Sequence, residues 1–195
     1  MCIISAVTFA TWITTFRIVL VPVFAILVGN YARSDSDDPA CAVYRIAALW
    51  VFLVAAISDA VDGFIARYFR QRSRLGELLD PIADKLLVLT ALISLSLGYV
   101  QEEWRFPLWF TILIISKDIL IVLGCYLIHL HKGVLKVRPN IPGKITTALL
   151  LVLITGALWQ PGWLPFALLL CVTAFFALWA FYFYLSDMFR QLQQK

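Results

Sequence analysis

Long apolar segments follow one another along the whole chain and are separated by short polar loops. A helix needs roughly 20 apolar residues to cross the hydrocarbon core of a bilayer, because it rises about 1.5 Å per residue. The pattern predicts six such helices, over about residues 12–28, 43–61, 81–99, 108–130, 145–159 and 164–185, the first of which contains Arg17 and Pro22. We therefore expect an all-α fold, a polytopic integral membrane protein with six transmembrane helices in one membrane domain over residues 1–195.

The composition agrees with this pattern. Hydrophobic residues make up 62% of the chain and charged residues 14%, and the mean hydropathy is +0.88. A soluble domain is roughly half apolar and a quarter charged. The chain is therefore expected to be embedded in the membrane along its whole length, and not to be a soluble domain with a single anchor.

The charged residues are divided unequally between the two ends of the predicted helices. One side carries the basic residues Arg67, Arg70, Arg72, Arg74, Lys132, Lys136, Arg138, Lys144, Arg190 and Lys195. The other side carries the acidic residues Asp35, Asp37, Asp38, Glu102 and Glu103, with few basic ones. Basic loops stay in the cytoplasm. We expect a multi-pass protein of the cell inner membrane with both termini cytoplasmic, and the net charge of +4 then reflects topology, with no nucleic-acid partner.

Four aspartates lie at the cytoplasmic ends of the second and third predicted helices. Asp59 and Asp62 are three residues apart and Asp80 and Asp84 are four apart, so each pair shares one face of its helix. A short basic loop joins the two helices, which makes them antiparallel neighbours. Four converging carboxylates repel one another unless cations balance them. Hard carboxylate oxygens suit Mg²⁺, Mn²⁺ or Ca²⁺, and four of them can hold two such ions.

Two other interpretations of the aspartates are open. They can be helix-end charges in the headgroup zone that pair with the arginines between them. They can also form the cation path of a small transporter. A transporter typically places its carboxylates near the middle of the membrane and shows paired halves. Here the carboxylates lie at one end of the helices, and no internal repeat is visible.

Small and basic residues accompany the aspartates. Gly63 directly follows Asp62, and a glycine lets a ligand approach the backbone closely, as Gly76 does further on. Arg67 lies one turn beyond Gly63 and begins the basic loop, which is predicted to run from residue 67 to residue 74. Its guanidinium fork can hold a phosphate.

Together these residues form the pattern D-x2-D-G-x2-A-R-x8-G-x3-D-x3-D, from Asp59 to Asp84. The pattern is similar to the signature of the CDP-alcohol phosphotransferases, or phosphatidyltransferases, which make phospholipids. The resemblance implies that Asp59, Asp62, Asp80 and Asp84 bind two divalent cations, Mg²⁺ or Mn²⁺. In that family the cations hold the pyrophosphate of a CDP-linked lipid such as CDP-diacylglycerol.

The resemblance also implies roles for single residues. Asp84 is expected to act as the general base, in addition to binding metal. The CDP-lipid is expected to contact Gly63, Arg67, Ser73 and Gly76. The hydroxyl of a small alcohol acceptor attacks the lipid-linked phosphate and CMP leaves. By the same resemblance, the protein is expected to work in the lipid bilayer as a homodimer with its active site on the cytoplasmic side.

The motif does not identify the acceptor alcohol. Basic residues outside the motif are therefore the candidates for binding the acceptor. Lys117 lies beside Asp118 in the fourth predicted helix, and Arg138 and Lys144 follow in and after the next loop. We expect Lys117, Arg138 and Lys144 to bind the acceptor, since cations suit a phosphorylated alcohol such as glycerol 3-phosphate. The alternatives are pairing of Lys117 and Asp118 with other helices, and positive-inside topology alone for the two loop residues.

Three segments refine the resemblance within the family. "TTFRIVLVPVF", "LLDPIADKLL" and "GKITT" look like phosphatidylglycerophosphate synthases, which transfer a phosphatidyl group from CDP-diacylglycerol to glycerol 3-phosphate. "SKDILIVLG" is similar to cardiolipin synthases, whose acceptor is phosphatidylglycerol. Transfer to glycerol 3-phosphate is the leading hypothesis. Cardiolipin synthesis, and transfer to inositol phosphate or serine, are the alternatives.

Overall fold

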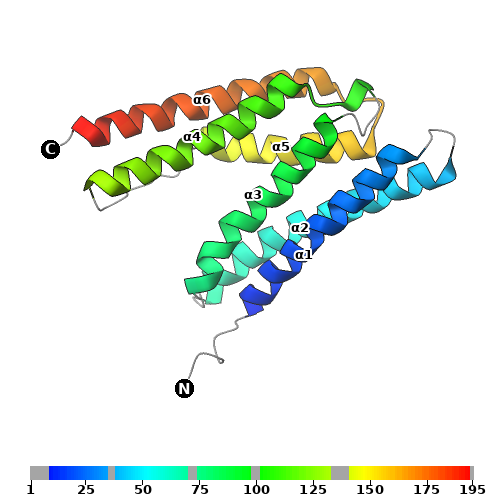
Figure 1. Ribbon diagram of the computed structural model, residues 1–195, viewed down its shortest axis with the longest axis horizontal. Helices are drawn as coiled ribbons and strands as arrows, with labels where there is room; N and C mark the ends of the chain where they lie inside the picture. The colour runs from blue at the N-terminus through cyan, green and yellow to red at the C-terminus, as the bar shows by residue number, and fades with distance from the viewer. Residues whose placement is uncertain (1–8, 35–37, 70–73, 98–101, 133–140, 194–195) are drawn as a thin grey trace. The chain divides into compact units, whose positions relative to one another are not determined.

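The computed structural model describes residues 9–34, 38–69, 74–97, 102–132 and 141–193. In this part of the chain the elements are α1 (Phe9–Arg33), α2 (Pro39–Phe69), α3 (Arg74–Ser96), the short 3₁₀ helix η2 (Glu102–Trp104), α4 (Leu108–Lys132), α5 (Ile141–Trp159) and α6 (Phe166–Gln193) (Figure 1). No strand occurs among these residues, so the predicted all-α fold is confirmed.

Four of the described helices contain a stretch that is long and apolar enough to cross a membrane. These stretches are Thr15–Arg33, Pro39–Ser58, Ile141–Trp159 and Phe166–Met188. In α3 the apolar part found among the described side chains is shorter, Lys85–Ser96. The chain is thus a membrane protein with at least four candidate spans, and the crossing of the membrane by α3 and α4 stays a prediction.

The helices around the aspartates extend further than the apolar segments. The loop predicted between residues 67 and 74 is wrong at both ends, because α2 continues to Phe69 and α3 already begins at Arg74. Arg67 therefore lies in the last turn of α2. Hydropathy finds only the part of a helix that lies in the hydrocarbon core, whereas arginine, leucine and alanine continue a helix beyond it, since they have high helix propensity.

Local capping explains where two of the helices begin and end. Asp38 precedes α2, and its Oδ1 accepts a hydrogen bond of 2.8 Å from the backbone N–H of Ala40. Pro39 then fills the first helical position, where no backbone donor is required. At the end of α3, Nε of Arg105 donates to the carbonyl of Ser96 at 3.1 Å, which satisfies one of the last free acceptors.

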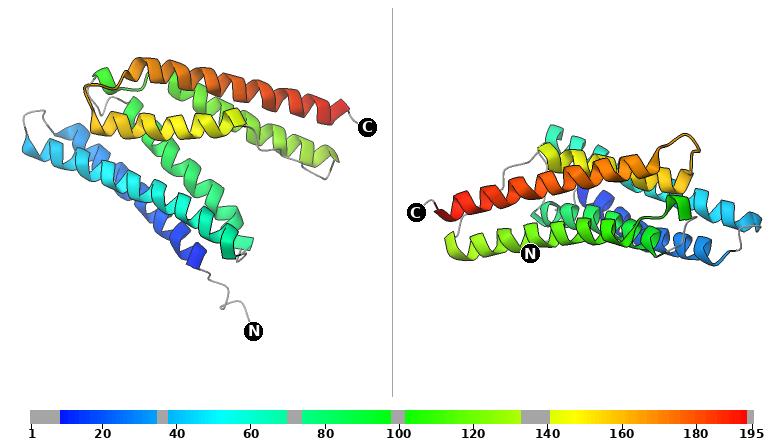
Figure 2. Two further views of the ribbon diagram at one scale, coloured as in Figure 1. Left: turned by 180° about the vertical axis from the view of Figure 1, so that it is seen from behind. Right: turned by 90° about the horizontal axis from the view of Figure 1, so that it is seen from above.

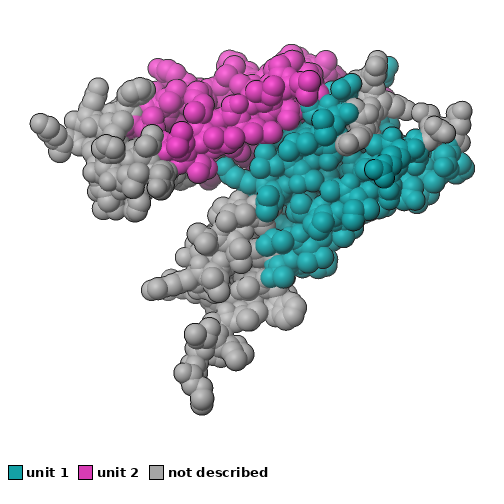
Figure 3. Space-filling view, viewed as in Figure 1, with its two compact units in different colours: residues 1–105, 154–161 teal, residues 106–153, 162–195 magenta. Residues whose placement is uncertain are grey.

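The chain divides into two compact units, which Figure 3 colours separately. Unit 1 comprises Met1–Arg105 with Ile154–Pro161, and therefore contains α1, α2, α3 and the end of α5. Unit 2 comprises Phe106–Leu153 with Gly162–Lys195, and contains α4, the greater part of α5 and α6. All four aspartates of the motif belong to unit 1.

In unit 1, α1 packs against both α2 and α3. The buried side chains recur every three, four or seven residues, which is the period of one helix face: Phe24, Val28 and Tyr31 on α1, Ala48, Phe52 and Ala55 on α2, and Leu87, Ala91 and Leu95 on α3. The start of α1, the end of α2 and the start of α3 lie at the same end of the unit (Figures 1 and 2). Neighbouring helices therefore alternate in direction from α1 to α3.

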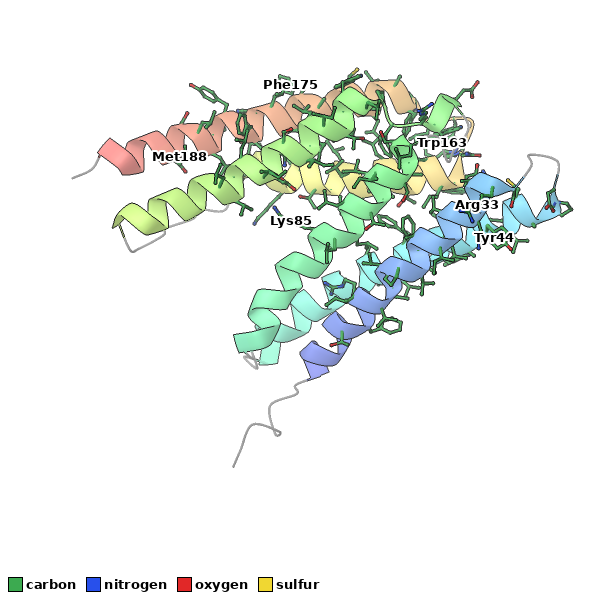
Figure 4. All side chains as sticks on the ribbon, viewed as in Figure 1. Arg33, Tyr44, Lys85, Trp163, Phe175 and Met188 are labelled. Carbon is green, nitrogen blue, oxygen red and sulfur yellow. The ribbon has the colours of Figure 1, made fainter. Side chains whose placement is uncertain are left out.

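In unit 2, α4 and α6 pack against each other and run in the same direction. Near their starts, the rings of Phe106 and Phe166 have centroids 5.5 Å apart. Further along, a Cβ placed on Gly124 would lie 2.6 Å from Sδ of Met188, a side chain labelled in Figure 4. The absence of a side chain at Gly124 therefore lets the two helices approach closely, as small residues do between membrane helices.

Hydroxyl groups inside the apolar helices are satisfied locally. Thr146 donates to the carbonyl of Pro142 at 2.8 Å, and Thr173 donates to the carbonyl of Leu169 at 2.7 Å. Each bond reaches back one turn along the same helix. Such bonds remove the cost of an unpaired hydroxyl in an apolar environment, so these threonines need no functional explanation.

Candidate active site

The motif occupies two consecutive antiparallel helices. Asp59 and Asp62 lie in α2, and Asp80 and Asp84 lie in α3. The structure describes the backbone at these four positions, and their side chains lie outside the described part. The site is therefore defined by the positions that the four residues occupy along the two helices.

The two positions in α2 continue its buried face. Asp59 lies seven residues after Phe52, and Asp62 lies seven residues after Ala55. Phe52 and Ala55 are both fully buried. Because seven residues make almost two whole turns of an α-helix, each aspartate occupies the same face as the buried residue before it. That face packs against α1 further along the helix.

The two positions in α3 follow the same rule in the opposite direction. Asp80 lies seven residues before Leu87, and Asp84 lies seven residues before Ala91. Both Leu87 and Ala91 are buried. All four aspartates therefore stand at positions on the inward faces of their helices. Carboxylates buried on such faces would need compensating cations or hydrogen bonds.

The two aspartate pairs occupy level positions in α2 and α3. Asp59 lies ten residues before Phe69, the last residue of α2, and Asp84 lies ten residues after Arg74, the first residue of α3. In antiparallel helices separated by only four residues, positions equally far from the connection lie at about the same height. The end of α2 and the start of α3 lie at the same end of unit 1 (Figure 1), so the two pairs occupy level positions along their helices.

This arrangement fits divalent cations. Four carboxylates at one height supply enough hard oxygen donors for two ions of the Mg²⁺ or Mn²⁺ type. Elsewhere, among the side chains that the structure describes, no group of three or more His, Cys, Asp or Glu residues gathers into a possible metal site. The motif is therefore the metal-site candidate that both the pattern and the helix geometry favour.

The other predicted contacts to the CDP-lipid fall around the same two helices. Gly63 and Arg67 lie in α2 and Gly76 lies in α3, all three within helical backbone. Ser73 lies outside the described residues. Gly63, Arg67 and Gly76 thus lie in the same two helices as the aspartates and close to them in sequence. Their contact with a ligand stays a prediction.

The residues predicted to bind the acceptor belong to unit 2. Nζ of Lys117 lies 3.0 Å from Oδ1 of the adjacent Asp118, and the Lys117 side chain is only 11% exposed. The charge of Lys117 is therefore balanced within its own helix, which lowers the cost of placing it in an apolar segment. Lys144 is exposed in the first turns of α5. Arg138 lies outside the described residues.

Among the charged side chains of unit 1 that the structure describes, Arg17 is the most deeply buried. In the sequence it is recognisable as a cation inside an apolar segment. Arg17 in α1 is fully buried, and its side chain is the largest of the fully buried ones that the structure describes. An arginine within a membrane span is by itself a sign of function. Its proximity to the motif, however, follows only from the packing of α1 against α2 and α3, the two helices that carry the motif.

The fold and the motif define a class, and comparison with known proteins agrees. A family model described as CDP-alcohol phosphatidyltransferase matches residues 7–184. The chain therefore belongs to the CDP-alcohol phosphatidyltransferase family and is a transferase of phospholipid biosynthesis.

The curated relatives narrow this class. A protein of Bacillus subtilis (strain 168) is 35% identical over 175 residues, which cover 88% of this chain and 86% of the relative. A protein of Escherichia coli (strain K12) is 32% identical, covering 90% of this chain and 92% of the relative, and one of Yersinia enterocolitica is 30% identical, covering 93% and 95%. All three are named CDP-diacylglycerol–glycerol-3-phosphate 3-phosphatidyltransferase.

Proposed function

We propose that this protein transfers a phosphatidyl group from CDP-diacylglycerol to glycerol 3-phosphate and releases CMP. The observation that carries the proposal is the complete eight-residue motif on α2 and α3, with its two aspartate pairs at one height. The names of relatives at 30–35% identity over most of the chain support the same acceptor.

The aspartates would hold two divalent cations, Mg²⁺ or Mn²⁺. Bound there, such cations neutralise charge on the diphosphate of the donor and on the departing CMP. The protein's part is to hold four carboxylates at one end of α2 and α3, so that the diphosphate is fixed at the membrane boundary while the acyl chains stay in the bilayer.

Asp84 is the proposed general base. Its carboxylate takes the proton from the acceptor hydroxyl as the hydroxyl oxygen bonds to the lipid-linked phosphorus. The bond between that phosphorus and the bridging oxygen breaks, and the oxygen leaves as part of CMP. Arg67 lies in the last turn of α2, where its guanidinium can pair with a phosphate, and Gly63 and Gly76 leave room for the nucleotide.

The phosphate of the acceptor is the proposed ligand of the basic residues Lys117, Arg138 and Lys144. Lys117 already pairs with the carboxylate of Asp118. To bind the acceptor, the Lys117 ammonium must interact with both that carboxylate and the acceptor phosphate. Lys144 is exposed and has its charge available for an anion. We further propose, from the family resemblance, that the protein is a homodimer. We also propose that it lies in the cell inner membrane with a cytoplasmic active site, because the basic residues Arg67, Arg70, Arg72 and Arg74 directly follow the first aspartate pair in the chain.

The decisive experiment identifies the lipid product. Purified protein receives CDP-diacylglycerol and Mg²⁺, and glycerol 3-phosphate, phosphatidylglycerol, inositol phosphate and serine are offered separately. We expect phosphatidylglycerophosphate from glycerol 3-phosphate alone, and we expect EDTA to stop its formation. Formation of cardiolipin from phosphatidylglycerol, without a product from glycerol 3-phosphate, would instead identify a cardiolipin synthase.

A pair of variants tests the role of the motif in the same assay. Asp84→Asn should reduce CMP release by about 10²-fold or more, because an amide cannot accept the proton. Asp38→Asn is the matched control: Asp38 is exposed and caps α2 at its other end, and asparagine caps a helix equally well. Turnover near the wild-type rate in Asp84→Asn would remove Asp84 from the mechanism.

A further inference from the structure

Arg17 is a fully buried cation inside the candidate span Thr15–Arg33. An arginine side chain keeps its positive charge in proteins. Burying such a charge away from water is costly unless negative groups lie near it. The aspartate positions on α2 and α3, the two helices that pack against α1, can supply such negative groups.

The contact between Phe24 and Phe52 fixes how α1 and α2 are aligned. Their ring centroids lie 5.9 Å apart, so these two positions are level in an antiparallel pair. Arg17 lies seven residues before Phe24, and Asp59 lies seven residues after Phe52. Seven residues advance a helix by about 10.5 Å and return it to nearly the same face. Arg17 and Asp59 are therefore level positions on facing sides of α1 and α2.

The alignment extends to α3. Asp59 is as far from the end of α2 as Asp84 is from the start of α3, so Arg17 is level with both aspartate pairs. The other described acidic side chains of unit 1, Asp38 and Glu103, are exposed. Asp38 also lies beyond the last residue of α1, at the opposite end of the helix from Arg17.

We propose that Arg17 is a positioning residue that sets the net charge of the metal site from α1; this inference rests on the proposed function. Four carboxylates and two divalent cations balance each other, so Arg17 adds one positive charge to this metal site. That sign favours the anionic diphosphate of the donor and disfavours additional or tighter binding of metal. Removing the charge of Arg17 should therefore have opposite effects on the two ligands.

The test measures Mn²⁺ binding directly, by the loss of the free Mn²⁺ signal in electron paramagnetic resonance. Full-length protein is titrated in nanodiscs of phosphatidylcholine, which carries no net charge. We expect Arg17→Gln to lower the Kd for Mn²⁺ by about fivefold and to raise the KM for CDP-diacylglycerol by about fivefold. Arg17→Lys, which keeps the charge, should stay within about twofold of wild type in both.

Arg33→Gln is the matched control, because it removes the same charge from the same helix. Arg33 is exposed at the far end of α1 (Figure 4), sixteen residues or about 24 Å from Arg17. Its effect on Mn²⁺ binding should be negligible, because exposed charges at that distance are screened. General damage to the fold would weaken Mn²⁺ binding, so tighter binding in Arg17→Gln separates a charge effect from a structural one.

Two outcomes would overturn the inference in different ways. If wild-type protein binds Mn²⁺ and Arg17→Gln binds it with equal or lower affinity, the role of Arg17 is refuted and the proposed function stands. If wild-type protein binds no Mn²⁺, the metal site and this inference both fail. Should Arg17→Gln not fold, the double variant Arg17→Gln with Asp59→Asn should recover folded protein, and a double variant that folds no better would also refute the role.

Discussion

At the scale of single residues, Gln160 shows how a polar side chain serves the end of a membrane helix. It follows the last residue of α5 and has a φ of 57°, the left-handed conformation that commonly ends a helix. Its backbone N–H donates to the carbonyl of Gly156 at 2.7 Å, and its Oε1 accepts a hydrogen bond from Nη1 of Arg45. Its Nε2 is buried and has no partner among the described residues.

This arrangement predicts that Gln160→Glu stabilises the protein. The carboxylate keeps an acceptor for Arg45, adds an opposite charge and removes the buried donor that lacks a partner. An unsatisfied buried donor costs about 1–3 kcal/mol, so we expect the free energy of unfolding to rise by about 1 kcal/mol. Thermal unfolding in detergent measures this. Gln160→Met is the control and should lower stability, because Arg45 then loses its acceptor; a lower Tm in Gln160→Glu would contradict the prediction.

At the scale of elements, small residues decide how closely the helices of unit 1 approach. Ala48 and Ala55 on α2 and Ala91 on α3 are all fully buried. Lipid is as apolar as these side chains, so close packing, more than the hydrophobic effect, holds membrane helices together. The aspartate positions continue these same buried helix faces. The distance between α2 and α3 therefore also determines how far apart the two aspartate pairs lie.

Enlarging one of these residues should therefore disturb both stability and activity. Ala55→Leu adds bulk between α1 and α2, which costs about 1–3 kcal/mol in a well-packed interior. We expect a lower Tm and a lower rate of CMP release. The control is Val54→Leu, one position away on an exposed part of the same helix, which should change neither property. Equal behaviour of the two variants would show that the buried face of α2 does not position the site.

At the scale of the whole molecule, the charges at the two ends of the helices set the orientation in the membrane. The described part of the chain contains six α-helices, of which four have stretches suited to crossing a bilayer. If α3 and α4 cross as well, the number of crossings is even and both ends of the chain lie on one side. From the basic residues we then expect that side, and the motif with it, to lie in the cytoplasm.

Reporter fusions test this topology. Green fluorescent protein fused after Lys195 should fluoresce, and alkaline phosphatase at the same position should be inactive, because one folds in the cytoplasm and the other needs the oxidising periplasm. Alkaline phosphatase fused after Ser34, beyond α1, should be active. An active phosphatase after Lys195 would mean an odd number of crossings or the reverse orientation.

Several features of this protein follow from the sequence by itself. The apolar segments gave the all-α membrane fold, since hydropathy is a local property and a helix satisfies its own backbone hydrogen bonds in lipid. The spacing of the four aspartates placed each pair on one helix face, because a helix has a fixed period. The motif from Asp59 to Asp84 also indicated the class of chemistry, and the family match extends the agreement to residues 7–184.

Other features depended on the tertiary structure. The continuation of α2 to Phe69, the deep burial of Arg17 and its level position with Asp59 all depend on which helices pack together and in what alignment. The same holds for the bond between Arg45 and Gln160, which joins residues far apart in the chain. Burial and long-range pairing are properties of several segments at once, so no pattern read along a single segment determines them.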